Sequence, residues 1–483
     1  MYILSIDQGT TGTTAVLYNG AGKPAGRAYR EVPQIYPNPG WVEHDPMLIW
    51  NTVVEAVEEL CTRCQGPIVG VGITNQRETT ILWDKKTGEP VHNAIVWQCR
   101  RTAELCRALH EYEAQFKEKT GLPVDPYFSG TKIRWLLENA KIPAPNDILF
   151  GTVDTWLIWK LTGGMVHATD YTNASRTLLF DITKRKWDER LCGLVGVPME
   201  LLPRVNRSME EYGVVESVPV LAGVPILSVV GDQQAALFGQ ACFEKGQMKN
   251  TYGTGCFVVL NTGEDAIFSD KGLITTLAVD GAGGPCFALE GPIFVAGAAI
   301  QWLRDELGLL ENAADSEAAA LEVEDNGGVY LVPAFVGLGA PYWDMQARGT
   351  LVGLTRGTNR NHIIRAALES MAYQTLDVLL AMEEEAGLET QALSVDGGAV
   401  ENDFLMQFQA DIIKRPVVRP SVIESTSLGA AYMAGLKAGM WKDADEVVRL
   451  RSIEKEFVPS MDAGLRNDLL AGWQKALRQA LMK

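Results

Sequence analysis

The feature that most constrains the fold is a strand–turn–strand pattern at the start of the chain. An apolar run over 2–6 ends at Asp7, a turn rich in glycine and threonine covers 9–14, and a second apolar run covers 15–18. This pattern predicts two neighbouring strands joined by a tight turn. Glycines allow a close backbone approach with outward N–H groups, and a carboxylate at a strand end can hold a hydrated divalent cation. The segment therefore suits a nucleotide polyphosphate, although an ordinary hairpin with a polar turn has the same pattern.

A similar pattern returns in the second half of the chain. Residues 250–260 (NTYGTGCFVVL) place another glycine–threonine turn before an apolar run. Just before it, the strand predicted over 225–230 leads to Asp232. A third glycine turn at 395–399 follows a predicted strand and precedes a helix predicted over 402–414. Strands alternate with helices in both halves, which predicts α/β domains with a ligand in the cleft between them.

Length and charge narrow the class of protein. A chain of 483 residues is too long for one comfortable core, so we predict two domains, 1–245 and 246–483. The net charge of −17 argues against nucleic acid and against an anionic membrane surface as partners. No apolar run approaches the length of a membrane span, so no membrane insertion is expected. Scattered cysteines, including a C-x-x-C at Cys61 and Cys64 without a partner pair, predict reduced thiols in a cytoplasmic protein.

Familiar catalytic motifs are missing from the sequence. It contains no G-x-x-x-x-G-K-[S/T], no G-x-G-x-x-G after the first strand, no G-x-S-x-G and no histidines at metal-ligand spacing. What remains is phosphoryl transfer, which needs positioned phosphates, a metal and a carboxylate that accepts a hydroxyl proton. Asp7 and Asp232 each end an apolar strand, so one can serve the metal and the other can be the base. The alternative is that each only caps the element that follows.

Two helices have clear boundary signals. Asp45 is expected to cap the first helix, whose apolar positions are Met47, Trp50, Val54, Val57 and Cys61. The longest predicted helix begins at an Asn361 cap and closes at Gly387.

Long segments spread over the whole chain carry a family pattern: SIDQGTT (5–11), QIYPNPGWVEHDP (34–46), GITNQRETT (72–80), AIVWQCRRT (94–102), DPYFSGTK (125–132), FGTVDTWLIW (150–159), DYTNASRT (170–177), GDQQAALFGQ (231–240), KNTYGTGCF (249–257), GLGAPYW (337–343) and DGGAV (396–400). In these segments the chain resembles the FGGY family of carbohydrate kinases, and within it the glycerol kinases. The glycine turns point only to the sugar-kinase superfamily, whereas GITNQRETT and DPYFSGTK point to glycerol.

The resemblance implies an α/β fold with two actin/hexokinase-like, ribonuclease H-like ATPase domains flanking a central cleft. It implies ATP-dependent phosphorylation of glycerol to sn-glycerol 3-phosphate, the first step of glycerol catabolism, with ATP and Mg²⁺ and as a homodimer or homotetramer. A kinase for another polyol or ketose (erythritol, xylulose or dihydroxyacetone) is the alternative within the family. A non-catalytic nucleotide-dependent binding protein on the same fold is a further alternative. It predicts lost acidic residues, yet Asp7 and Asp232 are both present.

The resemblance also assigns roles on the acceptor side. Arg77 and Glu78 are expected to bind glycerol hydroxyls, because a guanidinium donates a fork of hydrogen bonds and a carboxylate accepts them. Asp232 is the expected general base, and both Asp7 and Asp232 are the expected carboxylates at the magnesium site, with Asp7 acting through water. The other expected acceptor contacts are Trp97 and Phe257 against the carbon backbone, Tyr127 through its hydroxyl, and Gln233 beside the base.

On the nucleotide side, the expected contacts are Thr10, Thr11, Gly12, Thr13 and Thr14 in the first phosphate loop, Thr254 in the second, and Gly297, Gln301, Gly398 and Asn402 elsewhere. One departure stands out. Many relatives have Ser-Ser-Arg after the paired threonines, whereas this chain has Gly12-Thr13-Thr14. An arginine that would touch the nucleotide phosphates is therefore missing at position 14.

Overall fold

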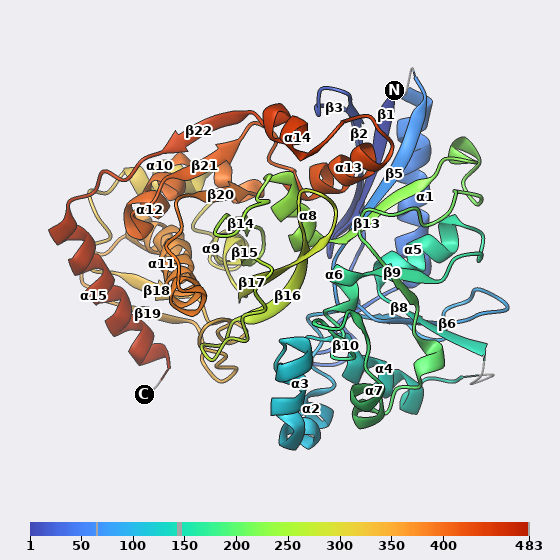
Figure 1. The fold of residues 1–483 in the computed structure, drawn as a ribbon. Coiled ribbons are helices and arrows are strands. Elements are labelled where there is room, and N and C mark those ends of the chain that lie inside the picture. Colours follow the sequence, from blue (N-terminus) through green and yellow to red (C-terminus); the bar gives the residue numbers. More distant parts are fainter. Residues whose placement is uncertain (64–65, 143–146, 482–483) are drawn as a thin grey trace.

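A computed structural model describes residues 1–63, 66–142 and 147–481. Its first sheet has the strand order β13-β5-β1-β2-β3 (Figure 1). β1 and β2 pair antiparallel, as do β2 and β3, whereas β1, β5 and β13 run parallel. The strands are β1 (Tyr2–Gln8), β2 (Gly12–Asn19), β3 (Pro24–Glu31), β5 (Ile68–Asn75) and β13 (Ile226–Gly231).

The second sheet repeats this arrangement. Its order is β16-β17-β15-β14-β20-β21-β22, so an antiparallel trio of β14, β15 and β17 is again extended by two parallel strands, β20 and β21. The strands are β14 (Met248–Tyr252), β15 (Cys256–Gly263), β16 (Ile274–Val279), β17 (Pro285–Ile293), β20 (Leu393–Asp396), β21 (Val417–Pro420) and β22 (Ile453–Phe457). The repeat predicted from the glycine turns is therefore confirmed at the level of sheet topology.

Two helices lie between the sheets. α8 (Asp232–Gly239) follows β13 and packs on β14, whereas α13 (Ser425–Lys437) comes from the second half and packs on β1, β5 and β13 (Figure 1). Their backbones touch, because a Cβ added at Gly429 would lie 1.8 Å from the Ala235 carbonyl oxygen. The domain boundary near residue 245 stays a prediction, since α13 joins its own half of the chain to the first sheet.

The remaining elements surround these two sheets. The helices are α1 (Pro46–Arg63), α2 (Ala103–Leu109), α3 (Glu113–Thr120), α4 (Ser129–Asn139), α5 (Val153–Leu161), α6 (Tyr171–Ala174), α7 (Glu189–Val195), α9 (Gly297–Asp305), α10 (Asp315–Leu321), α11 (Arg360–Ala386), α12 (Asp403–Ile413), α14 (Ala444–Leu450) and α15 (Ala463–Ala480). The short strands are β4 (Glu43–His44), β6 (Ile81–Asp84), β7 (Ala94–Ile95), β8 (Ile148–Gly151), β9 (Ala168–Asp170), β10 (Phe180–Asp181), β11 (Lys186–Trp187), β12 (Arg204–Asn206), β18 (Tyr330–Val332) and β19 (Thr350–Val352). Within the described ranges, none of the helices has both the length and the apolar composition of a bilayer-spanning segment.

The first helix begins as predicted, and Trp50 and Val57 of its predicted apolar face are buried. The Met47 N–H donates to the Asp45 carboxylate over 2.8 Å, which confirms the cap. The buried positions are centred one residue away from the predicted ones, because the helix packs across both β2 and β3. Its buried residues are Pro46, Ile49, Trp50, Thr52, Val53, Ala56, Val57 and Leu60, whereas Met47, Val54 and Cys61 lie at the edge. The C-x-x-C cannot be compared, since Cys64 lies outside the described residues.

The cap of the longest helix also needs correction. Asn359, rather than Asn361, accepts hydrogen bonds from the first-turn N–H groups of α11, and it has the extended backbone of a cap. Asn361 already lies within the first turn, and its side chain donates to Glu322 over 2.6 Å. The predicted close at Gly387 is confirmed, with φ of 60°.

Candidate functional site

The acidic residues predicted at strand ends meet at one edge of the first sheet. β1, β5 and β13 are parallel and in register, so Asp7 and Asp232 both lie at the carboxyl ends of these strands. Ligands of open α/β sheets bind at this edge. Burial raises the pKa of Asp7 to about 7, the charge of Asp232 adds to the shift, and Arg27 on β3 opposes it. The two carboxylates are thus close enough to repel each other.

Asp232 is the first residue of α8, and its carboxylate is held from two sides. Its Oδ1 atom accepts the Gln233 N–H over 2.7 Å and lies 3.1 Å from Nε of Arg77. Its side chain remains 28% exposed, whereas that of Arg77 is 2% exposed. The carboxylate is therefore accessible from outside the protein while its orientation is fixed.

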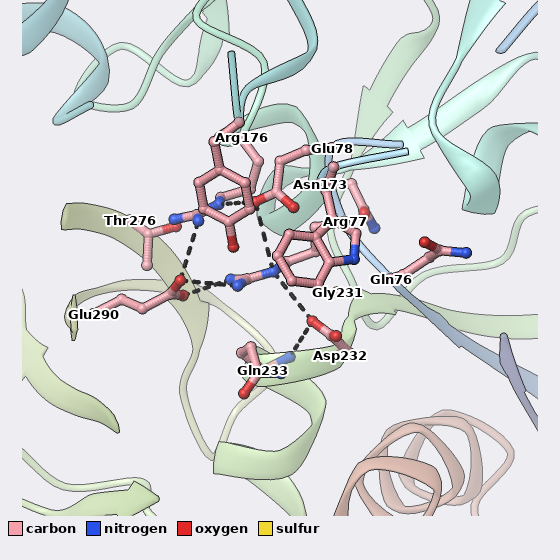
Figure 2. Close-up of polar contacts among 12 residues, drawn as sticks. Gln76, Arg77, Glu78, Asn173, Arg176, Gly231, Asp232, Gln233, Thr276 and Glu290 are labelled. Carbon is pink, nitrogen blue, oxygen red and sulfur yellow. Dashed lines mark hydrogen bonds and ion pairs between the residues drawn. The ribbon is translucent and has the colours of Figure 1, made fainter. Parts of the chain in front are cut away.

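Behind Asp232 lies a cluster of four buried charges, Arg77, Glu78, Arg176 and Glu290, which we call the charge quartet (Figure 2). Glu290 accepts two hydrogen bonds from Arg77, at 2.6 and 2.9 Å, and one from Arg176 at 3.0 Å. Arg176 also donates to Glu78 over 2.6 Å. Two positive and two negative side chains, none more than 2% exposed, make a nearly dry and balanced cluster.

The two carboxyls of the quartet differ in their protonation behaviour. Burial favours the neutral form of both, but the charges of Arg176 and Arg77 lower the pKa of Glu290 to about 2. For Glu78 burial prevails over the same two arginines, so its pKa is raised. Glu290 is therefore the firm counter-ion of the arginines, whereas Glu78 is the more adaptable partner for a hydroxyl group.

Glu78 also has an unusual backbone. Its φ of 59° lies in the left-handed region, which non-glycine residues seldom adopt. The hydroxyls of Thr80 and Ser129 donate to its carbonyl oxygen over 3.0 and 3.1 Å and hold this conformation. Such strain is often found where a side chain must be aimed at a ligand.

The predicted aromatic residues come together beside the quartet. The ring of Trp97 lies 5.6 Å from that of Tyr127 and 6.3 Å from that of Phe257, which comes from the second sheet. The indole N–H of Trp97 donates to Thr10 over 2.9 Å, so the aromatic wall touches the first glycine turn. A cavity of about 890 Å³ opens beside Trp97 and Tyr127, between loop 34–42 and the C-terminal half.

The first glycine turn has one close packing contact. A Cβ added at Gly12 would lie 2.4 Å from the ring of Tyr29 on β3, and the Tyr29 hydroxyl donates to the Thr11 carbonyl over 3.2 Å. Thr11 is exposed and Thr10 is half-buried. Tyr29 thus supports the turn from behind, and any side chain at position 12 would have to displace its ring.

The side chain of Thr13, one of the expected nucleotide contacts, faces α1. Its side chain is fully buried, and its Oγ1 atom lies 2.9 Å from the hydroxyl of Thr52 on α1. Side chains alternate along a strand, so the neighbouring Thr14 lies on the other face, the one it shares with its partner Asp7. Only the backbone of Thr13 is left for a nucleotide contact.

The second glycine turn meets the start of α9. The carbonyl of Thr254 accepts from Ala296 and Ala298, and the Gly297 N–H donates to the Gly253 carbonyl over 3.1 Å. Gln301 is exposed one helical turn later. The structure therefore brings three predicted nucleotide residues, Thr254, Gly297 and Gln301, to one place.

The third turn lies against the second. A Cβ added at Gly397 would lie 2.3 Å from the Tyr252 carbonyl, whereas one at Gly398 would meet nothing within 4 Å. Gly398 therefore faces open space. The side chain of Asn402 accepts from Leu405 over 2.8 Å as the cap of α12, and it donates to Ser316 over 3.3 Å. Asn402 thus serves the fold, whatever it contributes to a ligand.

The sequence did not single out Glu290, Arg176 and Lys249. Lys249 is fully buried, and its ammonium donates to Gln233 over 2.5 Å, Thr251 over 2.7 Å and the Phe257 carbonyl over 3.1 Å. A signal was available for Glu290, which is the one charged residue in the strand Pro285–Ile293. A lone charge in a buried strand requires a partner, but the sequence cannot say which.

The donor set fits a metal ion that is carried by a nucleotide. Among the described residues, no group of three or more His, Cys, Asp or Glu side chains could form a protein-only site. Mg²⁺ is commonly held by one or two carboxylates together with phosphate oxygens and water. The mutual repulsion of Asp7 and Asp232 at the carboxyl ends of the parallel strands suits that arrangement.

Comparisons with known proteins find matches along almost the whole chain. Models of the N-terminal and C-terminal domains of the FGGY family of carbohydrate kinases match residues 2–239 and 248–438. A glycerol kinase of Carboxydothermus hydrogenoformans is 56% identical, and one of Symbiobacterium thermophilum is 54% identical; in both cases the match covers 99% of this chain and 98% of the relative.

Solved structures give the same result for the fold. The crystal structure of Plasmodium falciparum glycerol kinase with ADP has a TM-score of 0.91 and 37% identity, covering 100% of this chain and 98% of that one. A ligand-bound xylulose kinase from Lactobacillus acidophilus, at 23% identity, shares the fold with a TM-score of 0.88 over 100% and 98% of the two chains. The predicted pair of actin-like ATPase domains is confirmed, and the chain belongs to the FGGY family of carbohydrate kinases.

Proposed function

We propose that this protein transfers the γ-phosphoryl group of ATP to glycerol and forms sn-glycerol 3-phosphate, the first step of glycerol catabolism. The observation that carries the proposal is the position of Asp232, whose side chain is 28% exposed and lies 3.1 Å from Arg77 of the charge quartet. Relatives that are 54–56% identical along almost the whole chain are glycerol kinases, which supports the same acceptor here.

The acceptor pocket suits a small uncharged triol. Arg77 donates and Glu78 accepts hydrogen bonds, which is what neighbouring hydroxyl groups need. Trp97 and Phe257 offer ring surfaces to the carbon backbone, and Tyr127 and Gln233 add polar contacts. A net-neutral cluster such as the quartet has no excess charge that would favour an ionic substrate.

Asp232 is the proposed general base. It accepts the proton of the glycerol hydroxyl as the hydroxyl oxygen bonds to the γ-phosphorus. The bond from that phosphorus to the β–γ bridging oxygen breaks in line, and ADP leaves. The backbone N–H groups of the glycine turns stabilise the charge on the transferred group. Closure of the cleft excludes water, which would otherwise accept the phosphoryl group.

For the nucleotide, we propose contacts from Thr10, Thr11, Gly12, the Thr13 backbone and Thr14 on one side, and from Thr254, Gly297, Gln301, Gly398 and Asn402 on the other. Asp7, with Asp232 nearby, would hold Mg²⁺ through water. When bound, this ion neutralises charge on the phosphate oxygens. Residues 1–245 and 246–483 are the proposed domains, the cytoplasm is the proposed compartment, and a homodimer or homotetramer is the proposed assembly.

A coupled assay of ADP release tests the proposal. Glycerol should support turnover with a kcat/KM far above that of erythritol, xylulose and dihydroxyacetone. Higher turnover of one of these three would move the protein to the alternative polyol or ketose kinase. ATP turnover with none of the four would favour the binding-protein alternative.

A further inference from the structure

Two buried charges of the second sheet lie in one row across its strands. Lys249 on β14 is in register with Val259 on β15, and Val259 is in register with Glu290 on β17. Residues in register on neighbouring strands point to the same face of a sheet. Lys249 and Glu290 are both 0% exposed. Buried charges are unfavourable unless they are paired. The partners of Lys249 and Glu290 therefore indicate what these two side chains do.

Glu290 contacts the acceptor side through Arg77. Its two oxygens take up both terminal nitrogens of the Arg77 guanidinium, at 2.6 and 2.9 Å. Nη1 of that guanidinium also donates to Gln234 over 3.1 Å, and Nε lies 3.1 Å from Asp232 (Figure 2). A bidentate contact fixes the plane of a guanidinium as well as its position. Glu290 thus sets the direction in which Arg77 faces the base and the acceptor.

Lys249 contacts the acceptor side through Gln233. Its ammonium donates to the Gln233 side-chain oxygen over 2.5 Å and to the Phe257 carbonyl over 3.1 Å. Because the lysine occupies the amide oxygen, the amide nitrogen of Gln233 is left as a donor. Lys249 therefore fixes both the place and the orientation of a residue adjacent to Asp232.

We propose that Glu290 and Lys249 are positioning residues for the acceptor alcohol. Both come from the second sheet, whereas the residues that contact the acceptor come mainly from the first. The inference rests on the proposed function, because the acceptor is the alcohol named there. It predicts that loss of either charge changes how the enzyme binds and selects the acceptor while nucleotide binding stays nearly the same. A purely structural ion pair would lower stability without this selectivity.

The experiment compares the variants Glu290→Gln, Glu290→Asp and Lys249→Gln with the wild type. Glu369→Gln is the matched control, because Glu369 is also buried in the C-terminal half and paired with Arg365 over 2.9 Å. KM and kcat are measured for glycerol and ATP, and kcat/KM for propane-1,2-diol and propane-1,3-diol, each of which lacks one hydroxyl. Circular dichroism checks that each variant is folded.

We expect Glu290→Gln and Lys249→Gln to raise the glycerol KM about tenfold and the ATP KM less than twofold. Glu290→Asp keeps the charge but shortens the reach, and it should raise the glycerol KM as well. Selectivity for glycerol over one of the two diols should fall about fivefold in the Glu290 variants. Glu369→Gln should change none of these ratios.

A wild-type glycerol KM and selectivity in folded Glu290→Gln and Lys249→Gln would overturn the inference, as would the same changes in Glu369→Gln. Loss of folding in all three site variants would assign both residues to stability and overturn it too. The proposed function fails separately, if the wild type itself does not phosphorylate glycerol.

Discussion

The proposed acceptor region and the turns proposed for the nucleotide differ in burial and in charge. The acceptor region buries two arginines and two glutamates with almost no solvent contact. The turns at 9–12 and 253–255 contain only glycine and threonine, and Thr11 and Thr254 are exposed. Glycerol has no charge, so its site must supply strong, oriented donors and acceptors. A nucleotide brings its own charge, so backbone N–H groups and hydroxyls are enough.

The two regions should therefore respond differently to mutation. In the acceptor region a side chain is fixed by other side chains, and the loss of one leaves a buried charge unpaired. In the turns that we propose for the nucleotide, backbone N–H groups would make the contacts, so the steric fit of the glycines should decide the effect of a substitution. The following predictions test this difference.

The largest effect is expected at the base. Asp232→Asn should lower kcat by about 10²- to 10⁴-fold, because the variant cannot accept the hydroxyl proton. Glycerol should still bind, as measured by calorimetry or by thermal protection. Asp188→Asn is the control, since Asp188 caps α7 and asparagine caps equally well. A kcat close to that of the wild type would remove Asp232 from the role.

Arg77→Lys should have the next largest effect. An ammonium cannot replace the bidentate contact with Glu290, so kcat/KM for glycerol should fall about 100-fold, or about 2.7 kcal/mol. The loss should appear mainly as a higher glycerol KM, and the ATP KM should stay within about twofold of the wild-type value. Arg134→Lys, at an exposed helix pair with Glu138, is the matched control. If only the ATP KM changed, Arg77 would belong to the nucleotide side.

On the nucleotide side, Gly12→Ala should raise the ATP KM about tenfold and leave the glycerol KM nearly unchanged. The new Cβ would lie 2.4 Å from the Tyr29 ring, so either the turn must shift or the ring must move and give up its contact with Thr11. Adding Tyr29→Ala should restore part of the affinity by opening space. Gly193→Ala, where a Cβ meets nothing within 4 Å, is the control. An equal loss for both substrates would contradict the separation of the two regions.

The smallest effect concerns pH. Burial lowers the pKa of Lys249 to about 8 from an ordinary value of 10.5. Between these values the unfolded chain binds a proton that the folded protein has released, so the stability contribution of this group rises with pH. Wild type should therefore gain stability relative to Lys249→Met between about pH 8 and pH 9.5. Urea unfolding at several pH values measures the free energy of unfolding of both proteins. A difference between them that does not change with pH would contradict the lowered pKa of Lys249.

Much of the fold followed from local patterns. The turn pattern at 9–14 and its repeat at 253–255 predicted the two hairpins, because glycine and alternating apolar residues are local signals. Two details of the helices differ from the prediction, because tertiary packing determines them. The buried face of α1 depends on the two strands beneath it, and the cap of α11 is Asn359 rather than its neighbour Asn361.

The grouping of the proposed acceptor residues was predictable for a different reason. Arg77, Glu78, Trp97, Tyr127 and Asp232 lie in long family segments, and the structure brings them to one place. Their detailed contacts with a ligand stay a proposal. The family segments also contain Arg176 and Lys249, but nothing in the sequence alone showed that either side chain contacts the site.

By itself the sequence determined the strands that flank the glycine turns, the repeat of those turns and the family. Only the tertiary structure decided that the Thr13 hydroxyl faces α1, and that Glu290 holds an arginine 213 residues away. The reason is physical. A turn is set by the conformations open to a few neighbouring residues, whereas the partner of a buried charge depends on how distant strands are brought together.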